Sequence, residues 1–174
     1  LDPLVKYNIV KDAEMHDFTD KVKNKTETIP VENRDDSKIG LVYKAMEDSA
    51  YQLDEETLRD MFSNLISSTV DNRKNNNIKP LFSTILKDLT STDAQVFELI
   101  YKENGMPMVA IRLDNKETGY GITVNANTLL YKDSFISKRT SLETLSHFGL
   151  IKMETDTRFA SANQQYKDFT ESEL

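Results

Sequence analysis

Residues 90–93, Thr-Ser-Thr-Asp, place three hydroxyl groups beside a carboxylate, a combination that could serve nucleophilic catalysis. A hydroxyl nucleophile needs a base within hydrogen-bond reach, usually a histidine or a lysine that a third group orients. The nearest lysine is Lys87, and the two histidines, His16 and His147, lie far away along the chain. The cluster therefore lacks an evident base for this chemistry.

The same residues have the spacing of a helix start. Thr90 as N-cap and Asp93 three residues later can bond each other's backbone N–H groups, with the carboxylate at the positive end of the helix. Thr92 with Gln95 is the alternative register. Either cap contributes about 1 kcal/mol, so the sequence favours a cap over a reactive site.

The two histidines suggest two further kinds of site. His16-Asp17 is typical of metal-dependent HD sites, but these need several more ligands, and the chain has only one other histidine. An arginine and a histidine on one helix, here Arg139 and His147, are the hallmark of certain helical RNases. Their spacing of eight is wider than that motif, and the helix start predicted at Thr140 falls between them. An RNase effector is therefore the least favoured hypothesis.

The acidic residues occur in pairs that lack the context of a metal site. No calcium loop, glycine-rich phosphate loop, GxSxG motif or HExxH motif is present. We therefore predict no catalytic, cofactor-binding or metal-binding residue, and we favour a protein that is not an enzyme. Solvated helix ends explain the acidic runs: Asp35-Asp36, Glu47-Asp48 and Asp54-Glu55-Glu56.

Composition narrows the class of protein. The 174 residues can form one substantial domain or two small ones. Without cysteine the chain can form no disulfide or thiolate site, which fits a cytoplasmic protein. No apolar run approaches the roughly 20 residues that span a bilayer, and the net charge of −7 disfavours phosphate backbones as ligands. Since the chain begins at Leu1 rather than Met, we expect another segment to precede it.

Apolar periodicity predicts five helices in the first part of the chain. The clearest stripe runs from Leu58 to Thr69, and Asp54 is the predicted N-cap of its helix. The polar sequence of residues 71–77 predicts a surface loop. The Asn104-Gly105 pair favours a left-handed cap that ends the fifth helix. The other helices are predicted over residues 3–25 and 37–51, from Pro80, and from the cap at residues 90–93.

The pattern becomes β-rich after Gly105. It predicts a hairpin, then a helix that begins with a capping box of Thr140 and Glu143 and ends at Gly149. A strand and a polar return strand complete the pattern. The predicted ranges are 108–113 and 120–124 for the hairpin, 139–149 for the helix, and 150–157 and 158–174 for the last two segments.

This order of elements is typical of a winged-helix unit. We therefore predict a mainly α fold, α+β overall, with an N-terminal helical domain at residues 1–92 and a winged-helix-like α/β domain at residues 93–174. DNA-binding winged helices usually present Arg, Lys, Asn or Gln to base edges. Basic residues only flank the predicted recognition helix, and they are the candidates for nucleic-acid contact: Lys132, Lys138 and Arg139.

Four stretches of residues 29–151 share the pattern of a known family: Ile29-Pro30 with Glu32-Asn33, the helix DEETLRDMFSNLISS, the run from Pro80 through Leu89 to Asp93-Ala94, and SLETLSHFGLI. Through these stretches the chain resembles the bacterial Abi-alpha family, whose name refers to abortive infection, a phage-defence outcome. The family often has His where this chain has Lys79, and Ser-Pro where it has Thr90-Ser91. The resemblance implies a role in phage response and carries over no catalytic residue.

These observations lead to one main hypothesis and two alternatives. The main hypothesis is a cytoplasmic phage-defence protein without a cofactor, which acts through protein–protein contacts, either with another protein or as a homo-oligomer. One alternative is a winged-helix DNA-binding regulator that uses Lys132, Lys138 and Arg139. The other is the RNase effector, for which His147 would be essential. A membrane is not among the expected partners.

Overall fold

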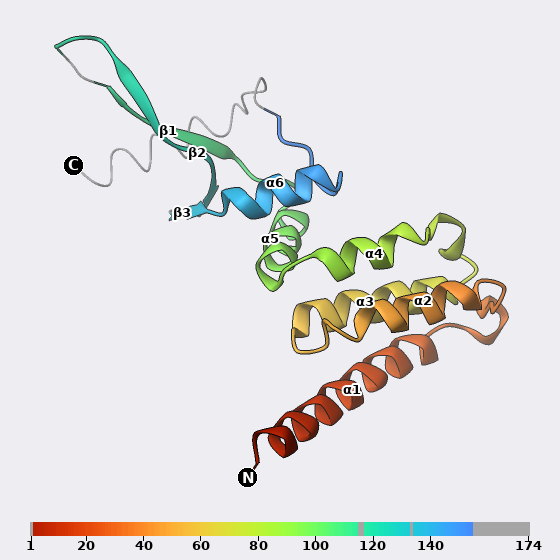
Figure 1. Cartoon of the computed structure of the whole chain (residues 1–174). Coiled ribbons are helices and arrows are strands. Elements are labelled where there is room, and N and C mark those ends of the chain that lie inside the picture. Colours follow the sequence, from red (N-terminus) through yellow and green to blue (C-terminus); the bar gives the residue numbers. More distant parts are fainter. Residues whose placement is uncertain (1, 115–116, 133, 155–174) are drawn as a thin grey trace. The chain divides into compact units, whose positions relative to one another are not determined.

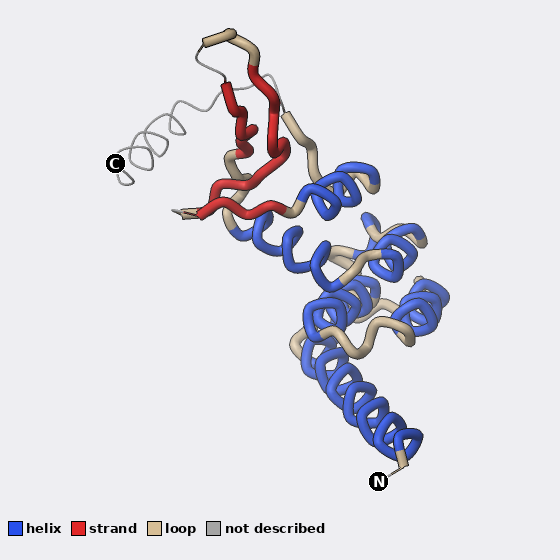
Figure 2. Tube along the Cα trace, turned by 60° about the vertical axis from the view of Figure 1, so that its left-hand side comes forward, coloured by secondary structure: helices blue, strands red, loops and turns tan. Residues whose placement is uncertain are grey.

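The computed structural model describes residues 2–114, 117–132 and 134–154 (Figure 1). Six α-helices and a small antiparallel sheet of three strands make up these residues (Figure 2). This confirms the mainly α fold class with α+β character. The chain forms two compact units, Leu1–Ala94 and Gln95–Leu174, which are described separately below. That residues 1–92 and 93–174 are domains stays a prediction.

The first unit is a bundle of four helices. α2 and α3 lie side by side in the middle, α1 packs against α3, and α4 contacts both α2 and α3 (Figure 1). Two 3₁₀ turns, over Val31–Asn33 and Asn75–Asn77, lie in the connections. The helices are α1 (Pro3–Glu27), α2 (Ile39–Ser49), α3 (Glu56–Thr69) and α4 (Leu81–Asp88).

The core of this unit is built on one face of α3. Phe62 and Ile66 are buried at its centre, as the apolar stripe of the sequence predicts. Phe18 from α1 is also completely buried in this core. Burial of a large apolar side chain stabilises a fold by roughly 1.5–3 kcal/mol, so these side chains hold the helices together. The remaining members of the cluster are Ala45 and Leu53, with Val22, Val42, Leu65 and Leu86 packed around them.

The predicted N-cap of α3 is wrong. The turn after α2 continues through Asp54, because the backbone N–H of Glu55 donates to the carbonyl of Gln52 (3.3 Å). Glu55 therefore takes the N-cap position in extended conformation, and its side chain makes no capping hydrogen bond.

The cap predicted at residues 90–93 is confirmed in its first register. The backbone N–H of Thr90 donates to Oδ2 of Asp93 (2.9 Å), and the backbone N–H of Asp93 donates to the hydroxyl of Thr90 (3.2 Å). The helix that follows is α5 (Ser91–Lys102). It ends as predicted: Asn104 has φ +53°, and the N–H of Gly105 donates to the carbonyl of Ile100 (3.0 Å).

The second unit combines the sheet with α6. The strand order is β1-β2-β3, β1 and β2 pair irregularly between Val109 and Arg112, and α6 contacts β2. Leu142 and Leu145 of α6 are buried, as are Leu129 and Leu130 of β2. The elements are β1 (Met108–Asp114), β2 (Gly121–Tyr131), β3 (Ser134–Ser137) and α6 (Arg139–His147).

Several local predictions for this unit are wrong. β2 extends to Tyr131, and β3 was not predicted, because the turn between them begins at Lys132 (φ +53°) rather than at Asn-Gly. The capping box of α6 is absent, since the helix already begins at Arg139 and Glu143 instead pairs with that arginine (2.7 Å). The end of α6 is as predicted, because Gly149 has φ +69° and donates its N–H to the carbonyl of Ser146 (3.0 Å).

The strand predicted after α6 does not form over residues 150–154. Residues 155–157 and the return strand at 158–174 lie outside the described residues. Among the described residues all three strands precede α6, whereas the winged-helix prediction needs strands after it. The winged-helix likeness is therefore not confirmed and stays a prediction.

Removal of either half of the cap at Thr90 and Asp93 should destabilise the protein. Thr90→Ala and Asp93→Ala should each lower the free energy of unfolding by about 1 kcal/mol, because each leaves a backbone N–H without its partner. The double variant should lose less than the sum of the two, since the residues satisfy each other. Urea denaturation measures these differences. Thr92→Ala is the control, and equal losses in all three single variants would contradict the assigned register.

Candidate functional site

Neither histidine lies in the kind of site that the sequence suggested for it, a metal site for His16 and an RNase pair for His147. His16 is exposed on α1, and the neighbouring Asp17 binds Nε of Arg59 (2.8 Å). In the part of the chain that the structure describes, no group of three or more acidic or histidine side chains is placed to hold a metal ion. On α6, eight residues of rise put Arg139 about 12 Å along the axis from His147, so the structure does not bring this pair together.

Two of the three candidates for nucleic-acid contact, Lys138 and Arg139, lie at the start of α6, whereas Lys132 lies at the other end of β3. Lys132 lies in the turn after β2 with its ammonium over the ring of Tyr131 (5.1 Å), and Lys138 is the N-cap residue of α6. Arg139 is held by Glu143, whose carboxylate accepts from Nε and raises the pKa of the guanidinium. All three are exposed, and a role for them in nucleic-acid binding stays a prediction.

Among the acidic residues, Asp48 has a structural role within the bundle. Burial raises the pKa of its carboxyl, but the hydrogen bond from Lys44 (2.5 Å) and the charge of Lys87 (3.7 Å) outweigh this effect, so the net pKa is lowered. The ionised carboxylate therefore links α2 to α4 and is not available to a metal.

A polar junction joins the α1–α2 connection to the α3–α4 connection. Arg34 and Asp71 form an isolated antiparallel bridge, and Asn33 and Asn72 are joined by side-chain and backbone hydrogen bonds. The carboxylate of Asp71 is buried and accepts both Nε (2.8 Å) and Nη2 (2.7 Å) of Arg73. This bidentate pair lowers the pKa of Asp71 from 3.8 to about 2.

A second part of the junction is centred on Asn75, which is buried. The side-chain amide of Asn75 donates to Oδ2 of Asp35 (2.7 Å), and the backbone carbonyl of Asn75 accepts a hydrogen bond from the ammonium of Lys38. The low-complexity run at 71–77, which the sequence places in a surface loop, therefore contains side chains that fix the loop to the chain before α2. Sequence reasoning missed this role because the partners lie about 40 residues apart.

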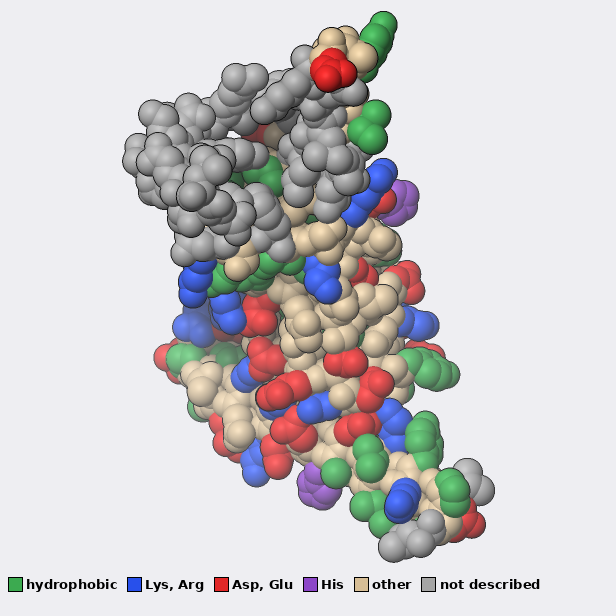
Figure 3. Space-filling view, turned by 90° about the vertical axis from the view of Figure 1, so that its left-hand side faces the viewer, with side chains coloured by type: hydrophobic (Ala, Val, Ile, Leu, Met, Phe, Trp, Pro, Cys, Tyr) green, Lys and Arg blue, Asp and Glu red, His purple; other side chains and the backbone are tan. Residues whose placement is uncertain are grey.

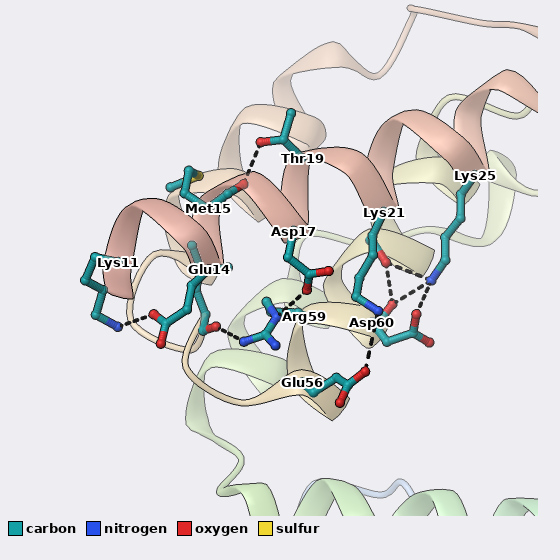
Figure 4. Close-up of polar contacts among 12 residues, drawn as sticks. Lys11, Glu14, Met15, Asp17, Thr19, Lys21, Lys25, Glu56, Arg59 and Asp60 are labelled. Carbon is teal, nitrogen blue, oxygen red and sulfur yellow. Dashed lines mark hydrogen bonds and ion pairs between the residues drawn. The ribbon is translucent and has the colours of Figure 1, made fainter. Parts of the chain in front are cut away.

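Several charged side chains pair across the seam between α1 and α3 (Figure 4). Asp17 pairs with Arg59 (2.8 Å), and Lys21 approaches Glu56 (3.9 Å). Arg59 also donates to the carbonyl of Leu53, which ties the seam to the turn after α2. This 25-residue helix therefore adds Phe18 and Val22 to the core and is oriented by charged pairs, without a continuous apolar stripe.

The seam contains a lysine and a serine in contact, a pair that can act as a catalytic dyad in other folds. Nζ of Lys25 donates to Oδ1 of Asp60 (2.5 Å), to the carbonyl of Asp60 (3.2 Å) and to the hydroxyl of Ser63 (2.8 Å). Three donated hydrogens leave the nitrogen no lone pair with which to act as a base. Ser63 is completely buried and donates to the carbonyl of Asp60, so this group is structural.

The N-terminal turns of α1 extend beyond the other helices of the bundle (Figures 1 and 2). Four large apolar side chains of these turns are about half exposed: Val5 (45%), Tyr7 (60%), Ile9 (57%) and Val10 (53%). Figure 3 shows hydrophobic side chains gathered at this end of α1, whereas acidic and basic side chains intermingle over the neighbouring face of the bundle. We call residues 3–10 the α1 overhang, and it is the candidate interaction site.

A comparison with family models assigns the chain to a family. The model described as abortive infection alpha matches residues 10–173. The chain belongs to the abortive infection alpha family. A search of curated proteins and a search of solved structures find no match. The family resemblance that the sequence predicts is thereby confirmed.

In this abortive infection alpha protein, the residues that carried the resemblance stabilise the fold. Ile29 is buried after α1, and Asn33 contributes to the polar junction. Pro80 is the N-cap residue of α4, Leu89 is buried and Asp93 completes the cap of α5. None of the α1 overhang lies in these stretches. Of the described helices, none is both long and apolar enough to cross a membrane.

Neutralisation of Asp71 should change how stability depends on pH. The pKa of the carboxyl is about 2 in the folded protein against an ordinary value of 3.8, so its ionisation stabilises the fold above pH 3.8, and this contribution is lost as the pH falls toward 2. Asp71→Asn should therefore lower the free energy of unfolding at neutral pH, and the difference from wild type should shrink in acid. Urea titrations at several pH values measure this, with Asp88→Asn as an exposed control. A difference that is constant with pH would contradict the assigned role.

Proposed function

We propose that this abortive infection alpha protein takes part in phage defence in the bacterial cytoplasm by contact with another protein. The family supports the setting, and the α1 overhang supports the mode of action. Exposed apolar side chains that gather on one part of a protein commonly mark a surface that a partner covers. Val5, Tyr7, Ile9 and Val10 lie within two turns of one helix and stay about half exposed, with Val5 and Ile9 on one side of the helix and Tyr7 and Val10 on another.

The charges near the overhang favour a protein as partner over a nucleic acid. Lys6 and Asp12 alternate in sign along the helix, and Lys11 is paired with Glu14 (2.9 Å). Phosphate backbones are bound by several cations that act together, and the overhang offers no such group. A second copy of the chain and a different protein both satisfy this proposal.

The overhang should be essential for protection against phage. Ile9→Glu and Val10→Glu put a charge into the proposed contact, and both side chains are exposed, so the fold should persist. We expect each variant to protect cells no better than an empty vector, and to lose the proteins that wild type captures from infected cells. Circular dichroism and thermal unfolding check the fold. Leu81→Glu, at an exposed apolar position of α4, is the matched control.

Three outcomes would contradict this proposal. Full protection by Ile9→Glu would show that the overhang is not required. Capture of duplex DNA that depends on Lys132, Lys138 and Arg139 would favour the DNA-binding regulator. Loss of protection in a folded His147→Ala variant, with the overhang variants still active, would favour the RNase effector.

A further inference from the structure

A hollow lies between the end of α1 and the end of α3, next to the polar junction. Its volume is about 410 Å³, within the usual range for sites that take small ligands. The walls come from residues 26–36, which connect α1 to α2, and from Val70 at the end of α3, and the junction holds these two parts of the chain together. The lining residues are Thr26, Glu27, Ile29, Arg34, Asp35, Asp36 and Val70.

Part of the hollow is apolar and rigid. Ile29 is 5% exposed, and Val70, at the end of α3, accepts the N–H of Asp35 with its backbone carbonyl (3.0 Å). The bridge between Arg34 and Asp71 fixes the two segments beside it. An extended methylene chain can therefore lie against a surface that already exists in the folded protein.

The charged groups in the hollow are mainly negative. Asp35 accepts hydrogen bonds from three neutral groups: the N–H and hydroxyl of Ser37 (2.8 and 2.9 Å) and the amide of Asn75 (2.7 Å). These hydrogen bonds, together with the nearby charge of Lys38, lower the pKa of the Asp35 carboxyl, so its negative charge persists. Among the described residues, none forms an ion pair with Asp36.

The one basic side chain in the lining does not neutralise these carboxylates directly. Arg34 donates from Nε to the carbonyl of Ile29 (3.1 Å) and from Nη2 to the carbonyl of Glu27 (3.4 Å). The carboxylate of Glu27 is 3.9 Å from Lys23, a long and exposed contact. Three carboxylates against one guanidinium leave a net charge of −2 in the lining.

We propose that this hollow binds a basic side chain, arginine or lysine, of a partner protein. The methylene stem would lie on Ile29 and Val70, and the cationic head would meet the carboxylates of Glu27 and Asp36. The inference rests on the proposed function, because it specifies the chemistry of the protein that is bound. It adds a polar contact, on another part of the bundle, to the apolar contact of the α1 overhang.

A short peptide tests the hollow without knowledge of the partner. In a ¹H–¹⁵N NMR titration of the full chain with acetyl-Gly-Arg-Gly-amide, the amide signals of Thr26, Ile29 and Val70 should shift in a saturable way. The same peptide with citrulline, which has nearly the same shape and no charge, should cause no such shift. Acetyl-Gly-Lys-Gly-amide should act at the same signals, and added salt should weaken both basic peptides.

Neutral variants locate the charges that matter. Glu27→Gln and Asp36→Asn should each weaken binding of the arginine peptide about three-fold, as expected for an exposed ion pair, whereas Asp88→Asn on α4 should have no effect. The spectrum of each free variant checks its fold. Equal binding of the citrulline peptide, unchanged affinity in both variants, or no shift at these signals would each overturn the proposal. These results leave the phage-protection assay of the overhang unaffected, so the two proposals fail separately.

Discussion

The bundle depends on burial of the apolar face of α3, with Phe62 and Ile66 at its centre. α3 has 14 residues, and α1, α2 and α4 all contact it. Each neighbour supplies only a few apolar side chains: Phe18 and Val22 from α1, Ala45 and Val42 from α2, and Leu86 from α4. The buried face of α3 therefore requires several helices at once, and the connections between them must hold each helix at the right distance.

This constraint explains why the polar contacts lie where they do. α1 gives one completely buried side chain to the core, so Asp17, Lys21 and Lys25 fix its direction through charged partners on α3. Exposed ion pairs each contribute about 0–1 kcal/mol, so they orient the helix more than they hold it. The apolar residues at the N-terminal end of α1 remain exposed in this arrangement. The proposed partner contact is placed there for this reason.

Local patterns allowed prediction of the helices and of several of their ends, though not of the starts of α3 and α6 nor of the contacts between loops. The spacing of Thr90 and Asp93 and the Asn104-Gly105 pair act within one turn of chain, so the sequence carries their full signal. β3 was missed because its turn at Lys132 has no typical turn residues. The polar junction could not be predicted, since Asn75 and Asp35 meet only after the bundle forms. The hollow beside it has no sequence signal of its own.

The cap that ends α5 also bears on the chemical lifetime of the chain. An asparagine followed by a flexible glycine is prone to cyclise, because the glycine nitrogen can attack the asparagine side chain and expel ammonia, and asparagine is among the thermolabile residues. Here the N–H of Gly105 donates to the carbonyl of Ile100 (3.0 Å). The nitrogen has to give up this bond before it can attack Asn104. The helix end thus slows deamidation at this Asn-Gly pair.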